Sequence, residues 1–470
     1  MLYYWRDGVH MALTPARMSA ELTRFALTNP YFPPAYTQTG RWVAAQAEIF
    51  ERLTRDFAKP EFGISETTID GRSVAVEDKP VLSLPYCDLL HFERETARND
   101  PKVLIVAPMS GHYATLLRGT VRAMLPHHDV YITDWHDAAQ VPHSLGTFNL
   151  DDFISYVIEY LRYLGPETHV IAVCQPAMPV MAASCVMTAQ KDPAVPKTMT
   201  LMGGPIDTRV SKTAATELAE KRDLDWFEQH VVHRVPFYYP GAGRRVYPGF
   251  LQLGAFMSMN LDRHVGKHFE FFQNLIEGDN DSAGAHRKFY DEYRAVMDLD
   301  AEFYLQTVEV VFQKHLLPKG EMVYTDPKDG TQTPVKPDKL KNIGLLTIEG
   351  EKDDISALGQ TLAAHTLCTG IPESRKYHHY QLNVGHYGIF NGSRWRTEIM
   401  PRIRHFIRSG EDGRDVIPKA DLKQIPDLAP EQWNTEKHSL KKLMEISNPE
   451  TRERVHKDPK RRGKATLWIS

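Results

Sequence analysis

The feature that most constrains the fold is the uncharged stretch at residues 170–190, which is long enough for a membrane-spanning helix. It opens, however, with β-branched valine and isoleucine residues, which are typical of a buried strand. Pro176 and Pro179 would also remove backbone donors that a spanning helix needs. From Met178 onward the composition favours a helix, in which a proline in the first turn is tolerated. The stretch therefore predicts a buried strand, a sharp turn and a helix.

Cys174 stands at this predicted turn, within the run Ala172-Val173-Cys174-Gln175-Pro176. A nucleophile on a tight strand-to-helix turn is lifted clear of the sheet, and the next backbone N–H, here that of Gln175, points at an oxyanion formed beside it. The positive end of the helix favours thiolate over thiol. The usual turn reads Gly-x-Ser-x-Gly, whereas this one has Ala172, Cys174 and Pro176 at the fixed positions. A structural cysteine at the end of a core strand is the alternative interpretation.

Composition narrows the class of protein. The chain has 470 residues and 42% hydrophobic content, enough for a large core and two or three structural units. Its net charge of -4 gives no general case for nucleic acid binding. The four cysteines are widely spaced and form no Cys-x-x-Cys pair, which favours a reducing compartment. Arg6 and Asp7 precede any apolar run long enough for a signal peptide, so we expect a cytoplasmic protein without a membrane span.

Strand and helix patterns alternate along residues 96–207. Residues 102–108 (KVLIVAP) form an apolar run without alternation, as expected for a parallel strand covered on both faces. Further patterns predict strands at 130–133 and 199–202 and a helix at 153–164. The alternation predicts a doubly wound, mostly parallel α/β sheet, and it places Cys174 at the end of a strand where such sheets bind ligands.

The loop after residues 102–108 begins with Met109 and Ser110. In a hydrolase of this architecture, the corresponding loop supplies the second donor to the oxyanion. We therefore expect the backbone N–H of Met109 or Ser110 to act together with that of Gln175. An ordinary strand-to-helix loop is the alternative.

Two further polar residues follow predicted strands in the C-terminal half. Asp353 comes after an apolar strand pattern at 344–348, in a turn that suits the acid of a catalytic triad, and Asp354 is its close competitor. His386 lies on a loop between a predicted strand and a predicted helix. Cysteine, aspartate and histidine then occur in the triad order of the α/β-hydrolase fold. The sequence thus predicts that fold, with Cys174, Asp353 and His386 as the catalytic residues.

The remaining segments are assigned by their patterns. Residues 1–95 predict an N-terminal helical and β-extension region, which either packs on the main domain or presents an apolar surface to a hydrophobic partner. Residues 208–335 carry mostly helical patterns and predict a cap inserted between core segments 96–207 and 336–410. Residues 411–470 form a charged tail, which predicts a solvated extension or a contact with a negatively charged surface.

Several segments resemble the intracellular poly(3-hydroxybutyrate) depolymerases, a polyhydroxyalkanoate depolymerase family with a cysteine nucleophile. They are residues 104–118 (LIVAPMSGHYATLLR), 170–179 (VIAVCQPAMP), 350–361 (GEKDDISALGQT), 384–395 (VGHYGIFNGSRW) and the N-terminal residues 1–16. The resemblance covers roughly residues 1–410. It implies that Cys174 is the nucleophile, His386 the base and Asp353 the acid. It also implies that the substrate is the amorphous polyester granule of the bacterial cytoplasm, without a cofactor or a metal ion.

Such a triad would form a thioester on Cys174, with the oxyanion held by Gln175 and by Met109 or Ser110, and water would release 3-hydroxybutyrate or its oligomers. Other acceptors define the alternatives: coenzyme A would make the enzyme a thiolytic depolymerase, and a growing chain would make it a polyhydroxyalkanoate synthase. A granule-binding protein with a vestigial site is a further alternative. The sequence leaves open the preferred side-chain length, the size of the products and the oligomeric state.

Overall fold

The structure is a computed structural model that describes residues 2–96, 98–259 and 261–409. The predicted charged tail at 411–470 therefore lies outside the described residues. None of the helices in the described ranges combines the length and the apolar composition needed to cross a membrane.

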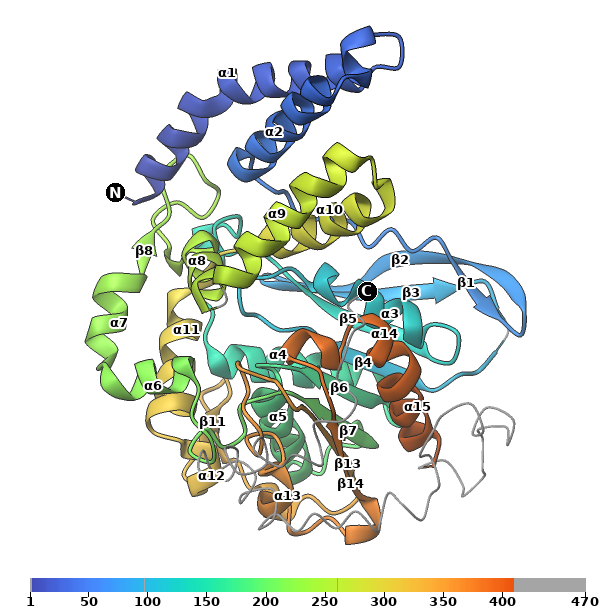
Figure 1. The fold of residues 1–470 in the computed structure, drawn as a ribbon. Helices are drawn as coiled ribbons and strands as arrows, with labels where there is room; N and C mark the ends of the chain where they lie inside the picture. Colours follow the sequence, from blue (N-terminus) through green and yellow to red (C-terminus); the bar gives the residue numbers. More distant parts are fainter. Residues whose placement is uncertain (1, 97, 260, 410–470) are drawn as a thin grey trace, which may run out of the picture.

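A nine-stranded sheet forms the centre of the molecule, with strand order β1-β2-β3-β5-β4-β6-β7-β13-β14 (Figure 1). Pairing is antiparallel from β1 to β5 and parallel from β5 through β14. The strands are β1 (Glu66–Ile69), β2 (Arg72–Leu84), β3 (Cys87–Arg94), β4 (Lys102–Val106), β5 (Asp129–Trp135), β6 (His169–Val173), β7 (Thr198–Met202), β13 (Gly344–Gly350) and β14 (Lys376–Gln381). The predicted mostly parallel α/β class is confirmed.

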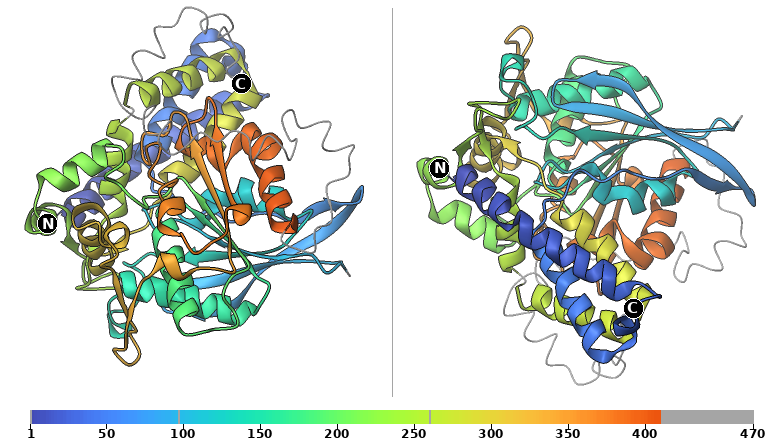
Figure 2. Two further views of the ribbon diagram at one scale, coloured as in Figure 1. Left: turned by 90° about the horizontal axis from the view of Figure 1, so that it is seen from below. Right: turned by 90° about the horizontal axis from the view of Figure 1, so that it is seen from above.

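Helices cover both faces of this sheet (Figure 2). On one face, α4 (Leu150–Leu164) packs against α5 (Ala177–Ala189), and on the other α3 (Arg118–Met124) packs against α15 (Met400–Ser409). Asn149 starts α4 because its side chain accepts a hydrogen bond from the N–H of Asp152 and its own N–H donates to the Asp152 carboxylate. With this cap, α4 begins at Leu150, slightly earlier than the predicted helix.

The N-terminal β region is more extended than its local patterns indicate. The sequence favours short β segments at residues 73–76 and 81–84, but a single strand, β2, spans both of them. A register shift between Pro80 and Leu82 accommodates the proline within the pairing with β3. The region is therefore part of the central sheet.

Between β7 and β13 the chain forms a mostly helical insertion. Its helices are α6 (Ala214–Lys221), α7 (Leu224–Val231), α8 (Gly249–Met259), α9 (Leu261–Glu277), α10 (Asn280–Arg294), α11 (Ala301–Thr307) and α12 (Leu316–Lys319). Short strands, which the sequence did not indicate, form two small sheets of their own: β8 (His233–Arg234), β9 (Arg245–Tyr247) and β10 (Leu299–Asp300), and β11 (Val323–Thr325) with β12 (Gln332–Pro334).

The first two helices form a hairpin beside this insertion. Helix α1 (Leu2–Thr28) packs along α2 (Gln38–Thr54), and α2 in turn contacts α9, with Trp42 edge-on to Phe272 (Figures 1 and 2). The hairpin is thus joined to the insertion through α2 and also through the start of α1, where Tyr3 contacts Asp298 and Phe250.

Candidate active site

Cys174 lies on the turn between β6 and α5, at the carboxyl end of a strand that is flanked by β4 and β7. Its φ angle of 66° is in the left-handed region, which non-glycine residues rarely adopt and which marks a strained position. The turn is held by two backbone hydrogen bonds: the Cys174 N–H donates to the Met202 carbonyl at 2.7 Å, and the Ala177 N–H donates to the Cys174 carbonyl at 3.1 Å. The predicted strand-turn-helix therefore has the geometry of a nucleophile elbow.

The elbow packs closely against the residues that follow the neighbouring strand β7, and two glycines there allow this contact. Gly204 follows β7, and a Cβ atom there would lie 2.2 Å from the Ala177 Cβ and 2.5 Å from the Cys174 carbonyl oxygen. Gly203, with φ of 54°, lies so close that a Cβ atom would be 3.2 Å from the Asp353 carboxylate. Gly203 and Gly204, which follow β7, thus provide the space that glycines around Cys174 would otherwise give. Sequence reasoning overlooked this pair, although two adjacent glycines after a predicted strand were a visible signal.

His386 and Asp353 come from loops after the last two strands of the sheet. The His386 Nδ1 lies 2.7 Å from an Asp353 carboxylate oxygen, and both side chains are buried. The other oxygen of Asp353 accepts the N–H groups of Ile355 and Ser356 at 2.9 and 2.8 Å, which fixes the carboxylate. The carboxylate that accepts the hydrogen bond from His386 is thus that of Asp353, which the sequence favoured over Asp354.

Cys174 lies close enough to the His386 ring for its charge to act on the His386 pKa. Burial by itself would lower the pKa of His386, but the charges of Asp353 and Cys174 and the hydrogen bond to Asp353 outweigh it and raise that pKa well above its usual value. The structure therefore brings the three side chains into one continuous chain of contacts, although they are far apart in the sequence.

The predicted oxyanion donors lie on two loops beside the elbow. Met109 is buried and Ser110 is partly exposed. Among the residues that the structure describes, no acceptor lies within hydrogen-bonding distance of the backbone N–H of Gln175, Met109 or Ser110. The side-chain amide atoms of Gln175 are also buried without a partner. Buried donors are rarely left unpaired, so the backbone N–H of Met109 and the side-chain NH₂ of Gln175 suit a ligand that carries negative charge or an acceptor oxygen.

The loop with Met109 is tied to the insertion. The Gly111 carbonyl accepts the N–H of Met297 at 2.7 Å, and His112 forms an isolated β-bridge with Val296. The His112 Nε2 lies 3.1 Å from the Tyr293 carbonyl, and burial lowers the His112 pKa to about 4, so the neutral ring donates this hydrogen bond. The end of α10 and the residues after it are therefore hydrogen-bonded to this loop and cover it.

Aromatic side chains line the approach to His386. The rings of Tyr387 and Tyr293 meet edge to face with centroids 6.0 Å apart, and the ring centroid of Phe390 lies 5.6 Å from that of His386. Burial raises the pKa of Tyr387 well above its usual value and that of Tyr293 to about 12, so both keep their protons at neutral pH. Sequence reasoning missed these residues, and only the position of Tyr387 next to His386 could have indicated one of them.

A second carboxylate stabilises the loop after Asp353. Glu349, on β13, is buried and accepts the backbone N–H groups of Gly359, Thr361 and Leu362 at 2.8–3.1 Å. Burial raises the Glu349 pKa to about 7. Its role is structural, because its oxygens are taken up by the loop.

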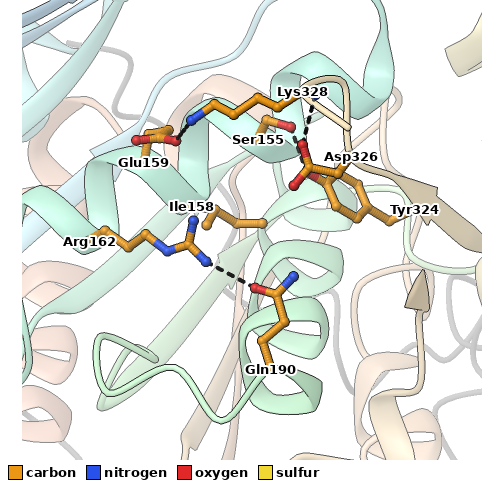
Figure 3. A pocket seen from close by; sticks show the side chains of 8 residues that line it. All are labelled: Ser155, Ile158, Glu159, Arg162, Gln190, Tyr324, Asp326 and Lys328. Atoms are coloured by element: carbon orange, nitrogen blue, oxygen red, sulfur yellow. Dashed lines mark hydrogen bonds and ion pairs between the residues drawn. The ribbon is translucent and has the colours of Figure 1, made fainter. Parts of the chain in front are cut away.

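A separate depression on the outer side of α4 is lined by polar side chains (Figure 3). Arg162 donates to Gln190 at 3.0 Å and pairs with Asp192 beside the depression, and Lys328 pairs with Glu159. It contains none of the predicted site residues. In the described ranges, no three His, Cys, Asp or Glu side chains lie close enough together to hold a metal ion.

Comparison with protein families matches residues 203–411 to the family described as PHB de-polymerase C-terminus. This segment includes Asp353 and His386, whereas Cys174 precedes it. A comparison with curated protein sequences finds no match. The match, the sheet order and the elbow together support an ester hydrolase of the α/β-hydrolase fold.

Solved structures with a similar chain course include three hydrolases. The 2-hydroxy-6-oxo-6-phenylhexa-2,4-dienoate hydrolase of Rhodococcus sp. strain RHA1 is 12% identical, with 71% of this chain and 99% of that chain covered and a TM-score of 0.38. The monoacylglycerol lipase of Paleococcus ferrophilus is 12% identical, with 66% and 96% covered and a TM-score of 0.37. The thermophilic esterase of Thermogutta terrifontis is 12% identical, with 74% and 97% covered and a TM-score of 0.35.

Proposed function

We propose that the chain is a granule-associated depolymerase that hydrolyses the ester bonds of amorphous poly(3-hydroxybutyrate) in the bacterial cytoplasm. The observation that carries this proposal is the grouping of Cys174 with the hydrogen-bonded pair His386 and Asp353 at the carboxyl ends of β6, β14 and β13 in the parallel part of one sheet. The family match of residues 203–411 supports the choice of polyester among ester substrates.

In the first half of the reaction, His386 accepts the thiol proton on the nitrogen that faces Cys174. The sulfur attacks an ester carbonyl carbon, and a C–S bond forms. Asp353 holds the Nδ1–H of His386 and stabilises the imidazolium. The C–O bond of the ester then breaks, the alcohol end of the polymer takes the proton from His386, and a thioester remains on Cys174.

In the second half, water replaces the departed alcohol. His386 takes one proton from the water as its oxygen attacks the thioester carbonyl. The C–S bond breaks, the thiolate recovers its proton from His386, and the chain end leaves as a carboxylic acid. Each turnover thus consumes one water molecule and yields 3-hydroxybutyrate or an oligomer.

The oxyanion of both tetrahedral intermediates would be held by the unpaired backbone N–H of Gln175 together with that of Met109 or Ser110. Loss of one such donor costs roughly 3–4 kcal/mol in known cases. Since these donors are backbone groups on loops that the fold already holds, little reorganisation is needed when the charge develops.

The surroundings of the nucleophile suit a linear, uncharged acyl chain. Tyr387 and Phe390 pack against the ring of His386, and Tyr293 connects them to α10. Phe289 on α10 stacks on Tyr293 at 5.5 Å and is 45% exposed, so the aromatic series continues to the protein surface. An apolar polyester segment could follow this series to Cys174.

The test uses purified protein and protein-free amorphous poly(3-hydroxybutyrate) granules, with and without coenzyme A, and follows soluble 3-hydroxybutyrate and its oligomers. Release without coenzyme A by the parent protein, and none by Cys174→Ala, is the expected result. Release only with coenzyme A would establish thiolysis. No release under either condition would overturn the proposal, and polymer formation from 3-hydroxybutyryl-CoA would then be measured to test for a synthase.

A further inference from the structure

Helix α1 presents an apolar stripe to solvent along its whole length. Its members recur at intervals of three, four or seven residues and so lie on one side of the helix. They are 53–72% exposed, although they are large apolar side chains: Tyr4 53%, Met11 72%, Met18 60%, Leu22 68% and Phe25 69%, with Trp5 68% beside them. Large exposed apolar side chains gathered on one side of a helix are typical of an interaction surface, whereas singly scattered ones are not.

The orientation of α1 is set by polar contacts on its opposite side. Arg6 donates to Asp56 at 2.5 Å, and Arg17 donates to the Thr54 carbonyl at 2.7 Å, so both cations face the end of α2. Tyr3 is buried beneath the start of the helix, where its hydroxyl donates to Asp298. The inward side of α1 therefore carries these polar contacts beside apolar residues such as Leu13 and Leu27, while the larger apolar side chains stay exposed.

The apolar surface continues at both ends of α1. At the N-terminal end, Tyr4 lies edge-on to Tyr238 with ring centroids 6.0 Å apart, and the adjacent Phe237 is 80% exposed. At the other end, in the connection to α2, Tyr31 is 92% exposed and Tyr36 is 65% exposed. The surface is therefore longer than the 27-residue helix itself, which spans about 40 Å.

Two features of the stripe indicate what covers it. In a coiled coil, large apolar side chains of one helix insert between those of the other. Gly8 and Pro15 occupy positions of the stripe where such side chains would be needed, so the stripe is not suited to pairing with another helix. The cations Arg6 and Arg17 are directed into the hairpin rather than to the rim, so they are not placed to attract an anionic lipid surface. Methionine and aromatic side chains instead suit an irregular, uncharged apolar surface.

We propose that this stripe is the surface by which the protein adsorbs to uncharged amorphous polyester, an inference that rests on the proposed function. The hairpin is placed for this role because α2 contacts α9, α9 contacts α10, and Tyr293 of α10 contacts Tyr387 beside His386. Adsorption through α1 thus holds polymer next to the helix that leads to the nucleophile.

The experiment measures co-sedimentation with amorphous poly(3-hydroxybutyrate) granules, in a Cys174→Ala background so that the granules stay intact. The stripe variant replaces four side chains by uncharged glutamine: Met11→Gln, Met18→Gln, Leu22→Gln and Phe25→Gln. A matched control replaces four apolar residues that are 44–52% exposed but scattered over other elements: Leu145→Gln, Tyr163→Gln, Leu218→Gln and Val323→Gln. Both sets are also made with Cys174 intact, and their hydrolysis of a short soluble ester reports folding and an intact site.

The expected result is granule adsorption weakened about ten-fold or more in the stripe variant, little change in the control, and unchanged soluble-ester turnover in both. Raised salt should not weaken adsorption by the parent, because the contact is apolar. Uncharged phosphatidylcholine vesicles should bind less protein than the polyester does.

Three outcomes would overturn the inference. Equal adsorption by the stripe variant and the parent would mean that the stripe is covered, for example by residues 410–470, or is not used. Equal binding to vesicles would make a lipid surface the occupant, and a parent dimer that the stripe variant loses would make it a second copy of the chain. Adsorption without polyester hydrolysis by the protein with Cys174 intact would refute the proposed function and leave the surface assignment standing.

Discussion

Helices α5 and α1 are both rich in apolar residues, yet they occupy opposite environments. In α5, every residue from Ala177 to Met187 is buried. The helix lies against β6 and β7 on one side and α4 on another, so no part of its surface needs polar side chains. It is therefore held by packing alone, and its N-terminus carries the elbow with Cys174.

In α1, the large apolar side chains face solvent and the polar contacts face the protein. Residue type did not decide which side turned inward. The buried Tyr3–Asp298 hydrogen bond did at the start of the helix, because leaving these two buried groups unpaired costs more than exposing methionine. We infer that the buried apolar helix serves stability and chemistry and that the exposed one serves contact.

The sharpest separation of these roles is expected from Cys174→Ala. Removing the nucleophile should lower turnover of a soluble ester and of polyester by at least about 10⁴-fold, since neither half of the reaction can proceed. Adsorption to granules should be unchanged. Ester release during a time course and co-sedimentation report the two roles separately, and loss of both in the variant would contradict the division.

The next largest effect is expected for Asp353→Asn, with Asp354→Asn as the matched control. A neutral amide in place of the Asp353 carboxylate could no longer stabilise the imidazolium of His386, so kcat should fall by roughly 10³- to 10⁴-fold. The neighbouring change should cost less than about three-fold. Steady-state kinetics on a soluble ester measure both, and equal losses would remove Asp353 from its proposed role.

The buried carboxyl of Asp137 should make the stability of the protein depend on pH. Asp137 accepts the backbone N–H of Asp298, the residue that Tyr3 of α1 contacts. Burial and the charge of Asp298 raise the pKa of Asp137 from 3.8 to about 7, so the folded protein binds this proton more tightly than the unfolded chain does. Stability from this group is therefore full below about pH 4 and is lost as pH rises to about 7, by up to roughly 1.4 kcal/mol per pH unit.

Asp137→Asn should make this slope shallower, because the amide has no proton to lose in this range while its oxygen can still accept the N–H groups of Ala139 and Asp298. The slope that remains comes from other buried carboxyls with raised pKa values, such as Glu349. Urea unfolding at several pH values between about 4 and 8 measures it. An unchanged slope in the variant would mean that other groups cause the dependence.

The contrast between α5 and α1 can be tested by replacing one methionine in each helix. Met181 in α5 is fully buried and Met18 in α1 is 60% exposed. Met181→Ala should lower the free energy of unfolding by about 2–5 kcal/mol through the cavity it leaves. Met18→Ala should change it by less than about 0.5 kcal/mol. Similar costs for both, measured by chemical denaturation, would show that α1 is packed as a core helix.

The smallest effect is expected from adding one methyl group beneath the elbow. Gly204→Ala places a Cβ against Ala177 and the Cys174 carbonyl, and it should cost about 1–3 kcal/mol of stability and disturb the turn. Gly254 in α8 has no neighbouring atom within 4 Å of such a Cβ, so Gly254→Ala should be neutral or stabilise by about 0.5 kcal/mol. Thermal unfolding of the two variants gives the comparison directly.

Much of the central sheet was predictable, because its strands carry local patterns. The apolar runs at residues 102–106 and 169–173 are buried on both faces, and hydrophobic periodicity is sensitive to this. The elbow was predictable for the same reason, since Cys174 lies between a β-branched run and a helix-favouring one. Asp353 and His386 could be chosen as triad candidates because they follow Cys174 in the order that the α/β-hydrolase fold requires. The 2.7 Å contact between them depends on the whole fold.

The parts that could not be predicted depend on contacts between distant segments. The orientation of α1 depends on the buried hydrogen bond between Tyr3 and Asp298, and amphipathic spacing alone does not say which side of the helix faces outward. The same holds for Gly204, whose importance comes from Ala177 on another element. Tyr293 reaches the site only because the insertion folds back over the sheet.

The hydrogen bond from Met297 to Gly111 and the bridge between His112 and Val296 have a consequence for the timing of catalysis. A covering segment that is bonded to the loop beneath it cannot swing open like a hinged flap without distorting that loop, which carries Met109 and Ser110, the proposed oxyanion donors. Passage to Cys174 then depends on rotations of side chains such as Tyr387, which take nanoseconds when exposed and longer when packed, rather than on microsecond-to-millisecond domain motion. Turnover on polymer should accordingly be paced by the arrival of chain segments or by the chemistry, with no lag while a gate opens.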